Sequence, residues 1–427
     1  MDKYYDAKTE TLTIPYNFTY KNEIIPEETQ TIIFKATGTR LLYLILNKFT
    51  DTNSKLTHLI FGRGFNQLVD LSSLTITHLT FGLCFNKPID YLPNTLEHLT
   101  LGDNFSQQID SLPKSLLYLT LGCSFSKSID SLPKSLIYLK CGNYFVNTIN
   151  GSLLPENLET LIFGNCFDKP IKEDSLPPNL KTLSFKHYFN KPIKEGSLPS
   201  SLTHLKFGYC FNQSIKGLLP ASLTHLTFGW RFGQPLNVTR DNFHIIFKDK
   251  QDEDIVFDCN KIPISLTHLT FGFCFNQSAD IFHKTNNALN KSSELNLKYL
   301  SFGKWFNRPI INYPSSLTHL TLGFSFNQEL DNLPSSLTHL TLGFFFNQEL
   351  DNLPPNMEYL SFYSKLQINN MPHGINTIKI YFSFGDYYNQ SVDNLPPSVQ
   401  KIIVNNLSKK NFLKKIPFGC EVVEETE

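Results

Sequence analysis

Hydrophobic residues recur with a 20-residue period along much of the chain, most clearly in two consecutive blocks. Residues 315–334 are SSLTHLTLGFSFNQELDNLP and residues 335–354 are SSLTHLTLGFFFNQELDNLP, so the blocks differ only in Ser325 against Phe345. Leu320 and Leu322 alternate with polar neighbours, which predicts a short strand with the leucines directed inward and threonine and histidine directed outward. A unit this short cannot enclose its own core, so the repetition predicts a solenoid in which each turn, or rung, packs against the next.

The motif Gly-x-x-Phe aligns the units. Glycine suits a tight turn after the strand, and the proline near the end of the unit begins the next turn. With so many turn residues the unit leaves no room for a regular helix, and the variations in its length predict a surface loop before the next Leu-Pro. The glycine stands at positions 62, 82, 102, 122, 142, 164, 208, 229, 272, 303, 323, 343 and 385, with Lys186 in the equivalent place between 164 and 208.

The pattern weakens toward both ends, as expected for rungs whose outer face meets water. We expect the array to begin near residue 12, and we interpret residues 42–46 with Phe49 as a further degenerate rung. The chain then divides into an N-terminal cap with degenerate rungs at 1–50, regular repeats at 51–237, an irregular segment with a degenerate rung and an insertion around one good rung at 238–296, regular then degenerate repeats at 297–404, and a C-terminal cap with an acidic tail at 405–427.

The predicted fold class is therefore mainly β. We expect a leucine-rich-repeat-like solenoid of about 16–18 short-strand rungs, with one curved parallel sheet and few or no regular helices.

A column of phenylalanines is the predicted core, because equivalent positions of successive rungs stack on one another. The 427 residues include 37 phenylalanines, and many of them occupy the last position of Gly-x-x-Phe. These residues are Phe65, Phe85, Phe105, Phe125, Phe145, Phe167, Phe189, Phe211, Phe232, Phe275, Phe306, Phe326 and Phe346.

A column of histidines and tyrosines is the candidate partner surface, since it occupies the outward third position of the unit. A surface role in forming strands, a binding face for a partner, and a metal or pH-sensing site between adjacent histidines are the alternatives. We name these residues the His/Tyr column: His58, His78, His98, Tyr118, Tyr138, His204, His225, His268, Tyr299, His319 and His339.

The composition and the motifs do not indicate catalysis, or binding to nucleic acid, membrane or metal. Lys plus Arg equal Asp plus Glu at 38 each, so no net charge attracts nucleic acid or an anionic membrane. We find no signal peptide, no long apolar run, no nucleophile motif, no phosphate loop and no zinc signature in the sequence. We expect a monomeric, intracellular, cytoplasmic protein that is not an enzyme and has no cofactor, and that binds neither nucleic acid nor membrane.

Three units share the motif Phe-Asn-x-Pro-Ile, in the segments Phe85-Asn86-Lys87-Pro88-Ile89, Phe189-Asn190-Lys191-Pro192-Ile193 and Phe306-Asn307-Arg308-Pro309-Ile310. With these segments, the units resemble the leucine-rich repeat and, more specifically, the FNIP repeat of social amoebae and giant viruses, which is named for Phe-Asn-Ile-Pro.

The resemblance implies a function in protein binding. We predict a non-catalytic repeat scaffold that binds an unidentified protein through an extended solenoid surface. Some FNIP proteins carry an F-box, so the alternative is a substrate-recognition subunit that acts with a ubiquitin-ligase adaptor, although we find no F-box in this chain. A third hypothesis, an enzyme or carbohydrate binder, requires an exposed aromatic platform on the concave side.

Overall fold

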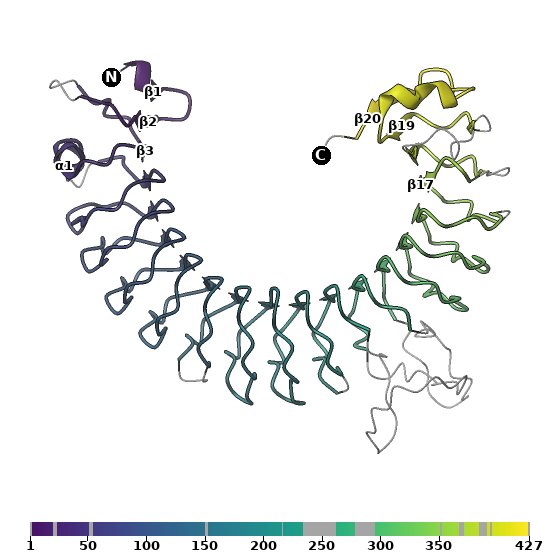
Figure 1. Ribbon diagram of the computed structural model, residues 1–427, viewed down its shortest axis with the longest axis horizontal. Coiled ribbons are helices and arrows are strands. Elements are labelled where there is room, and N and C mark those ends of the chain that lie inside the picture. The colour runs from purple at the N-terminus through teal and green to yellow at the C-terminus, as the bar shows by residue number, and fades with distance from the viewer. Residues whose placement is uncertain are drawn as a thin grey trace. The chain divides into compact units, whose positions relative to one another are not determined.

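The computed structural model describes residues 2–19, 24–50, 54–149, 153–215, 217–233, 262–277, 295–350, 352–366, 371–383, 391–392 and 395–425. The chain forms two compact units, unit 1 from Met1 to Gly208 and unit 2 from Tyr209 to Glu427. Each unit is a run of short strands joined by irregular connections (Figure 1).

Unit 1 begins with a 3₁₀ turn, η1 (Asp2–Tyr4), and contains one short helix, α1 (Thr39–Leu46), which is followed by η2 (Asn47–Phe49). Its strands are β1 (Tyr5–Asp6), β2 (Thr11–Ile14), β3 (Thr31–Phe34), β4 (His58–Phe61), β5 (His78–Thr80), β6 (His98–Thr100), β7 (Tyr118–Thr120), β8 (Tyr138–Lys140), β9 (Thr160–Ile162), β10 (Thr182–Ser184) and β11 (His204–Lys206).

Unit 2 contains the 3₁₀ helix η5 (Leu407–Phe412). Its strands are β12 (His225–Thr227), β13 (His268–Thr270), β14 (Tyr299–Ser301), β15 (His319–Thr321), β16 (His339–Thr341), β17 (Tyr359–Tyr363), β18 (Thr377–Tyr381), β19 (Lys401–Val404) and β20 (Glu421–Glu424).

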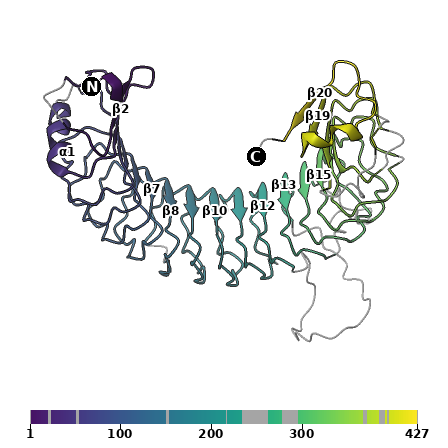
Figure 2. The ribbon, with the colours of Figure 1, turned by 45° about the horizontal axis from the view of Figure 1, so that its top comes forward.

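Successive strands pair in parallel with equivalent positions side by side. In unit 1 His78 pairs with His98 and Leu79 with Leu99, and in unit 2 His319 pairs with His339. Only β1 departs from this rule among the described pairs, because it runs antiparallel to β2. Figure 2 shows β7 and β8 of unit 1 side by side and pointing the same way. The predicted fold class is confirmed: the protein is a mainly β, leucine-rich-repeat-like parallel solenoid of about 17 turns with few helices.

The predicted phenylalanine column is the core of both units, and all its members are buried. Rings of neighbouring rungs lie parallel, with 6.1 Å between the centroids of Phe85 and Phe105 and an interplanar angle of 6°. Where a second phenylalanine directly follows the strand, it stacks within the same rung, as Phe81 does on Phe85 with 3.7 Å between the ring centroids. Leu320 and Leu322 are also buried, so the predicted inward alternation is correct.

The glycine of Gly-x-x-Phe begins a tight turn after the strand, as predicted: the backbone N–H of Phe105 donates to the carbonyl oxygen of Gly102 at 3.0 Å. This turn does not require positive φ, which among the described glycines occurs only at Gly196, Gly217 and Gly419. What excludes a side chain is close approach: an ideal Cβ on Gly102 would lie 1.8 Å from the carbonyl oxygen of Gly82, and one on Gly323 would lie 1.8 Å from that of Gly303. A side chain at this position would therefore push adjacent rungs apart.

Asparagine after the phenylalanine links one rung to the next. The Asn307 side-chain carbonyl accepts a hydrogen bond from the backbone N–H of Asn327 at 2.9 Å, and Asn327 accepts one from Asn347 at 3.0 Å. Asp168 does the same for Asn190 in unit 1. Asparagine or aspartate at this position therefore satisfies a backbone donor that the strand ladder does not reach.

One sequence interpretation is wrong. Residues 42–46 and Phe49 do not form a degenerate strand rung but belong to α1 and η2. Leu42, Ile45 and Leu46 are buried together with Phe49, whereas Leu44 is 45% exposed. Buried residues at i, i+3, i+4 and i+7 follow the period of a helix, which accounts for the difference. The array does begin near residue 12, where β2 pairs in parallel with β3.

The five-segment division stays a prediction. Much of 238–296, including the proposed degenerate rung and insertion, lies outside the described residues. The good rung between them is present as β13. No described helix combines the length and the apolar character that crossing a bilayer requires.

We expect Gly102→Ala to destabilise unit 1 by about 1–3 kcal/mol, because the new methyl group would overlap backbone atoms that cannot move aside without separating two rungs. Chemical denaturation measures the change. Gly64→Ala is the control, because the atom nearest to its Cβ would be 3.9 Å away, and it should change stability by less than about 0.5 kcal/mol. Equal effects would contradict the close-approach explanation.

Two neighbouring phenylalanines give a second test. Phe346 is buried, so Phe346→Ala should cost about 3–5 kcal/mol in the free energy of unfolding. Phe345 is 50% exposed and its equivalent in the preceding block is Ser325, so Phe345→Ser should leave stability within about 0.5 kcal/mol of the unsubstituted chain. Hydrogen exchange should show the loss confined to rungs near β16, and a uniform loss across the chain would argue against nearest-neighbour stabilisation.

Candidate binding surface

In unit 1 the structure brings five members of the His/Tyr column into one stack. The His78 ring lies between those of His58 and His98, at centroid distances of 4.1 and 4.0 Å. Tyr118 continues the stack 4.2 Å from His98. Tyr138 follows at 5.9 Å with a tilt of 36°.

In unit 2 five further members form a second stack. His225 and His268 lie 4.0 Å apart, and Tyr299 lies between His268 at 4.1 Å and His319 at 4.2 Å. His339 lies 4.1 Å from His319.

His204, the remaining member, lies on β11 of unit 1. Within unit 1, Thr160 on β9 and Thr182 on β10 occupy the third position between Tyr138 and His204. Apart from His204 and Tyr299, which are exposed, the rings are half-buried, so each stack presents its edges rather than its faces to solvent.

The threonine before each of several histidines sets the state of the imidazole. The Thr318 hydroxyl lies 3.1 Å from the carbonyl oxygen of Lys298 and 2.9 Å from Nδ1 of His319. Because a carbonyl oxygen can only accept, the hydroxyl donates to it, and we infer that Nδ1 carries a proton and donates to the hydroxyl. The same two contacts recur at His58, His78, His204, His268 and His339.

Stacking also disfavours protonation of the imidazoles. Partial burial lowers the pKa of His78 below its usual value of 6.5, and the neighbouring His58 and His98 lower it further. Burial, with the charge of His339, likewise lowers the pKa of His319. Glu97 beside His98 and Glu358 near His339 oppose these shifts without reversing them. His78, His98, His319 and His339 are therefore neutral at physiological pH.

The geometry does not support a metal between adjacent histidines. Parallel stacked rings direct their nitrogen lone pairs in parallel rather than toward a common point, whereas a metal needs convergent donors. Within the described ranges, no group of three or more His, Cys, Asp or Glu side chains could hold a metal ion.

The column also fails as a platform for sugars. Tyr299 has an imidazole on each side, so neither ring face is free to stack on a ligand. Carbohydrate binding, the third hypothesis, requires such a free face.

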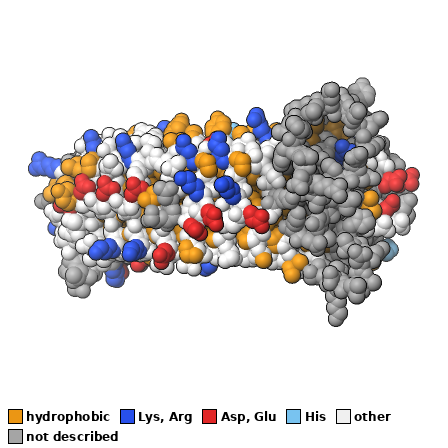
Figure 3. Space-filling model, turned by 90° about the horizontal axis from the view of Figure 1, so that it is seen from below, with side chains coloured by type: hydrophobic (Ala, Val, Ile, Leu, Met, Phe, Trp, Pro, Cys, Tyr) orange, Lys and Arg blue, Asp and Glu red, His pale blue; other side chains and the backbone are white. Residues whose placement is uncertain are grey.

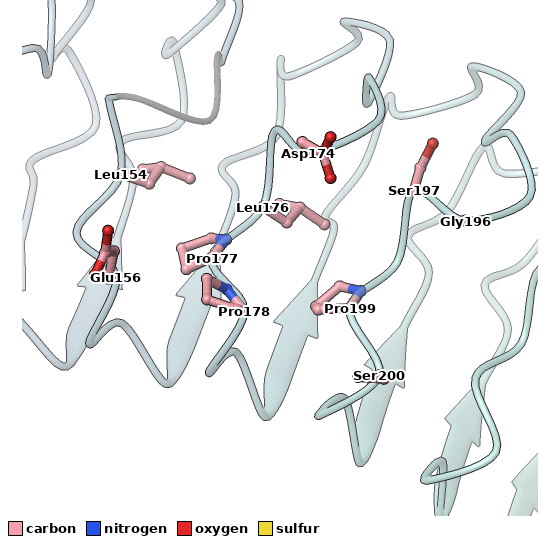
Figure 4. A pocket seen from close by; sticks show the side chains of 10 residues that line it. All are labelled: Leu154, Glu156, Asp174, Leu176, Pro177, Pro178, Gly196, Ser197, Pro199 and Ser200. Carbon is pink, nitrogen blue, oxygen red and sulfur yellow. The ribbon is translucent and has the colours of Figure 1, made fainter.

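Two pockets lie among the described turns and strands of unit 1. One of about 400 Å³ is lined by Glu156, Asp174 and Ser197 together with prolines of two consecutive rungs, Pro177, Pro178 and Pro199 (Figure 4). Another, of about 420 Å³, lies beside Glu159 and Lys181. The two carboxylates of the first pocket occupy repeated turn positions, and nothing there resembles a nucleophile with a base.

A second feature, which the sequence analysis missed, follows the strands of unit 2. In unit 2 the first or second residue after the motif glycine is often aromatic or cationic. By contrast, the face of the molecule shown in Figure 3 mixes charges of both signs with apolar side chains. Comparing this position between rungs would have revealed it. We name these residues the aromatic row: Tyr209, Trp230, Arg231, Phe273, Lys304, Trp305, Phe324, Phe344, Phe345 and Lys365.

Comparison with known proteins agrees with the repeat architecture. A family model described as FNIP Repeat matches residues 85–124, 125–166, 167–210, 211–239, 306–345 and 326–365, which together cover half of the chain. This chain belongs to the FNIP repeat family. The family resemblance predicted from Phe-Asn-x-Pro is therefore confirmed. A search of curated proteins finds no match for this FNIP repeat protein.

Solved structures support the same fold. The FNIP repeat protein is similar to CroV588 of a giant virus, a leucine-rich-repeat protein described as having a novel circular structure. The identity is 30% and the TM-score 0.63, and the match covers 97% of this chain and 72% of that one. It is also similar to YopM from Yersinia enterocolitica, with 18% identity, a TM-score of 0.50, and coverage of 98% and 92%. The second likeness concerns the fold alone.

We expect the stability of the protein to fall on mild acidification. The lowered pKa values mean that the unfolded chain binds more protons than the folded one below about pH 6.5. The stabilisation is complete above that pH and is lost as the pH falls through the folded-state pKa values. Thermal unfolding followed between about pH 7.5 and about pH 5.5 measures this, before most carboxylates titrate.

His78→Tyr provides the control for this prediction. Tyrosine already occupies the column beside His98 as Tyr118, so the stack should survive while a titrating group is lost. The fall in melting temperature over this pH range should be smaller in the variant. An unchanged fall would place the acid sensitivity outside the column.

Proposed function

We propose that this FNIP repeat protein is a non-catalytic scaffold that binds other proteins through the outward side of its strands. The observation that supports the proposal best is the pair of half-exposed His/Tyr stacks. They form continuous surfaces over consecutive rungs, and the parallel register holds every ring in place. Leucine-rich-repeat-like solenoids are typically used for protein binding.

The chemistry of the column suits a protein partner. Stacked, pre-ordered rings contribute apolar area with little further loss of side-chain entropy on binding. The neutral imidazoles leave Nε2 as an acceptor, and the outward threonines beside them offer hydroxyls. Such a surface favours a partner with hydrogen-bond donors and apolar side chains over a strongly charged one.

Proximity labelling in cells that express the chain tests the proposal. His319→Glu with His339→Glu should reduce the recovery of specific partners by about tenfold, because two charges would have to be desolvated at the contact. The matched control is Glu329→Lys with Glu349→Lys on the same two rungs, since these glutamates are exposed and lie outside the column.

The control should keep the partners, and both variants should retain the strand content of the unsubstituted chain by circular dichroism. Partners that are recovered equally with the column variant would refute binding through the strand side of unit 2. Loss in the control alone would place the partner on the turns.

A further inference from the structure

The aromatic row of unit 2 is a stack in which the ring faces are largely taken. Trp230 lies between Tyr209 at 5.4 Å and Phe273 at 3.4 Å, with interplanar angles of 18° and 9°. Phe324 and Phe344 stack at 5.1 Å and 10°. What remains accessible is mainly ring edges, which carry the positive end of the aromatic quadrupole.

Ammonium groups fill the gaps in this stack. Lys304 Nζ lies 5.2 Å from the ring centroid of Phe273 and 4.7 Å from that of Phe324, so it bridges the two aromatic runs. Lys365 Nζ lies 4.5 Å from the Phe344 centroid at the other end. In the described part of the chain, neither lysine makes an ion pair. Partial burial lowers the pKa of Lys365, so its charge is incompletely solvated.

The backbone holds the row in a fixed register. The residue at the second position of the row donates its N–H to the carbonyl oxygen at the first position of the preceding rung, as Trp305 does to Phe273 at 3.0 Å and Phe345 to Phe324 at 2.9 Å. Trp305 is 57% exposed and Phe345 is 50% exposed. The row is thus a rigid strip that is both apolar and positively charged.

A lysine on β18 shows which chemical group pairs with a cation that lies over an aromatic ring. Lys379 lies 4.8 Å from the ring centroid of Tyr381, and its ammonium pairs with the carboxylate of Glu425, which follows β20. The cation-over-ring geometry is the same as at Lys304 and Lys365, but here a carboxylate completes it. The positions of the row themselves carry no acidic residue.

We propose that the aromatic row is the docking surface for an acidic segment of a partner protein, one in which carboxylates alternate with apolar side chains. The carboxylates pair with Lys304 and Lys365, and the apolar side chains pack on the exposed edges of Trp305 and Phe345. This inference rests on the proposed protein-binding function, but it assigns a different face of unit 2 from the His/Tyr column and names the chemistry of the partner.

Charge and geometry favour a peptide over other anionic ligands. Bases and sugars bind aromatic rows by stacking on ring faces, and here rings and ammonium groups cover most of those faces. Nucleic acid and anionic membranes also draw on long-range attraction, whereas this chain has no net charge. A peptide needs only the few cations that the row supplies.

Fluorescence anisotropy with the full chain tests the inference. The probe is a labelled peptide of about 12 residues in which glutamate alternates with leucine and phenylalanine, and a second peptide has lysine in place of glutamate. Only the glutamate peptide should bind. Lys304→Glu with Lys365→Glu should weaken binding by about tenfold or more, and Phe345→Ser by about threefold.

Matched variants exclude loss of folding as the cause. Phe345→Ser only copies the preceding block, where Ser325 stands. Lys206→Glu with Lys298→Glu reverses two exposed charges on the strand side and should leave the affinity unchanged. If the variant with Lys206→Glu and Lys298→Glu weakens binding as much as the row variants do, the proposed row is wrong while binding through the strand side stands.

Other results would also overturn the inference. One is failure of the glutamate peptide to bind. Another is tighter binding of oligouridylate or of phosphatidylserine vesicles, tested in the same assay. A third is self-association in light scattering that Phe345→Ser abolishes, since the occupant would then be a second copy of the chain. None of these readouts depends on the proximity-labelling result, so the two proposals can fail separately.

Discussion

Every position of the repeat must pack against its own equivalent one rung away, and the rest of the structure depends on this constraint. The backbone sets the distance between rungs through parallel hydrogen bonds. At Gly102 and Gly323 the separation is so short that a Cβ would overlap the preceding carbonyl. Flat phenylalanine rings meet the constraint by stacking in parallel, and asparagine meets it by accepting from the next backbone N–H. A residue type that cannot pack on itself is restricted to positions where the repeat is open to solvent.

The same constraint shapes the candidate surfaces. A histidine or tyrosine that recurs at one outward position is forced into a stack, which orders its ring, covers its faces and lowers the imidazole pKa. The column is therefore a firm surface but an unsuitable metal site or sugar platform. In the aromatic row, Lys304 replaces an aromatic residue without breaking the stack, because an ammonium group also packs on ring faces. Substitutions of this kind keep the rungs packed and change the surface chemistry, so they can give the solenoid specificity for a binding partner.

The repeat made much of this molecule predictable. Exact recurrence of Leu320, Leu322 and Phe326 one unit later identified strand, core and stacking direction, because in a solenoid sequence period and spatial period coincide. The prediction was wrong at residues 42–46, where a short apolar run fits a strand or a helix. It placed the tight turn at the glycine correctly but did not foresee the close approach of the preceding rung, because one sequence shows that a side chain is absent but not which neighbouring backbone excludes it. The aromatic row was not predicted because its residues differ in type and share only their position, one or two residues after the motif glycine.

By itself, the sequence determined the repeat, the solenoid, the phenylalanine core and the outward His/Tyr column, since all of these follow from periodicity. The tertiary structure decided how equivalent residues meet. It showed that the imidazoles stack at about 4 Å, that the ammonium groups of Lys304 and Lys365 lie over rings, and that residues 39–46, in the connection between β3 and β4, form α1 in place of a strand. These are matters of distance and orientation between residues about 20 or more positions apart, which depend on the register and spacing of folded rungs.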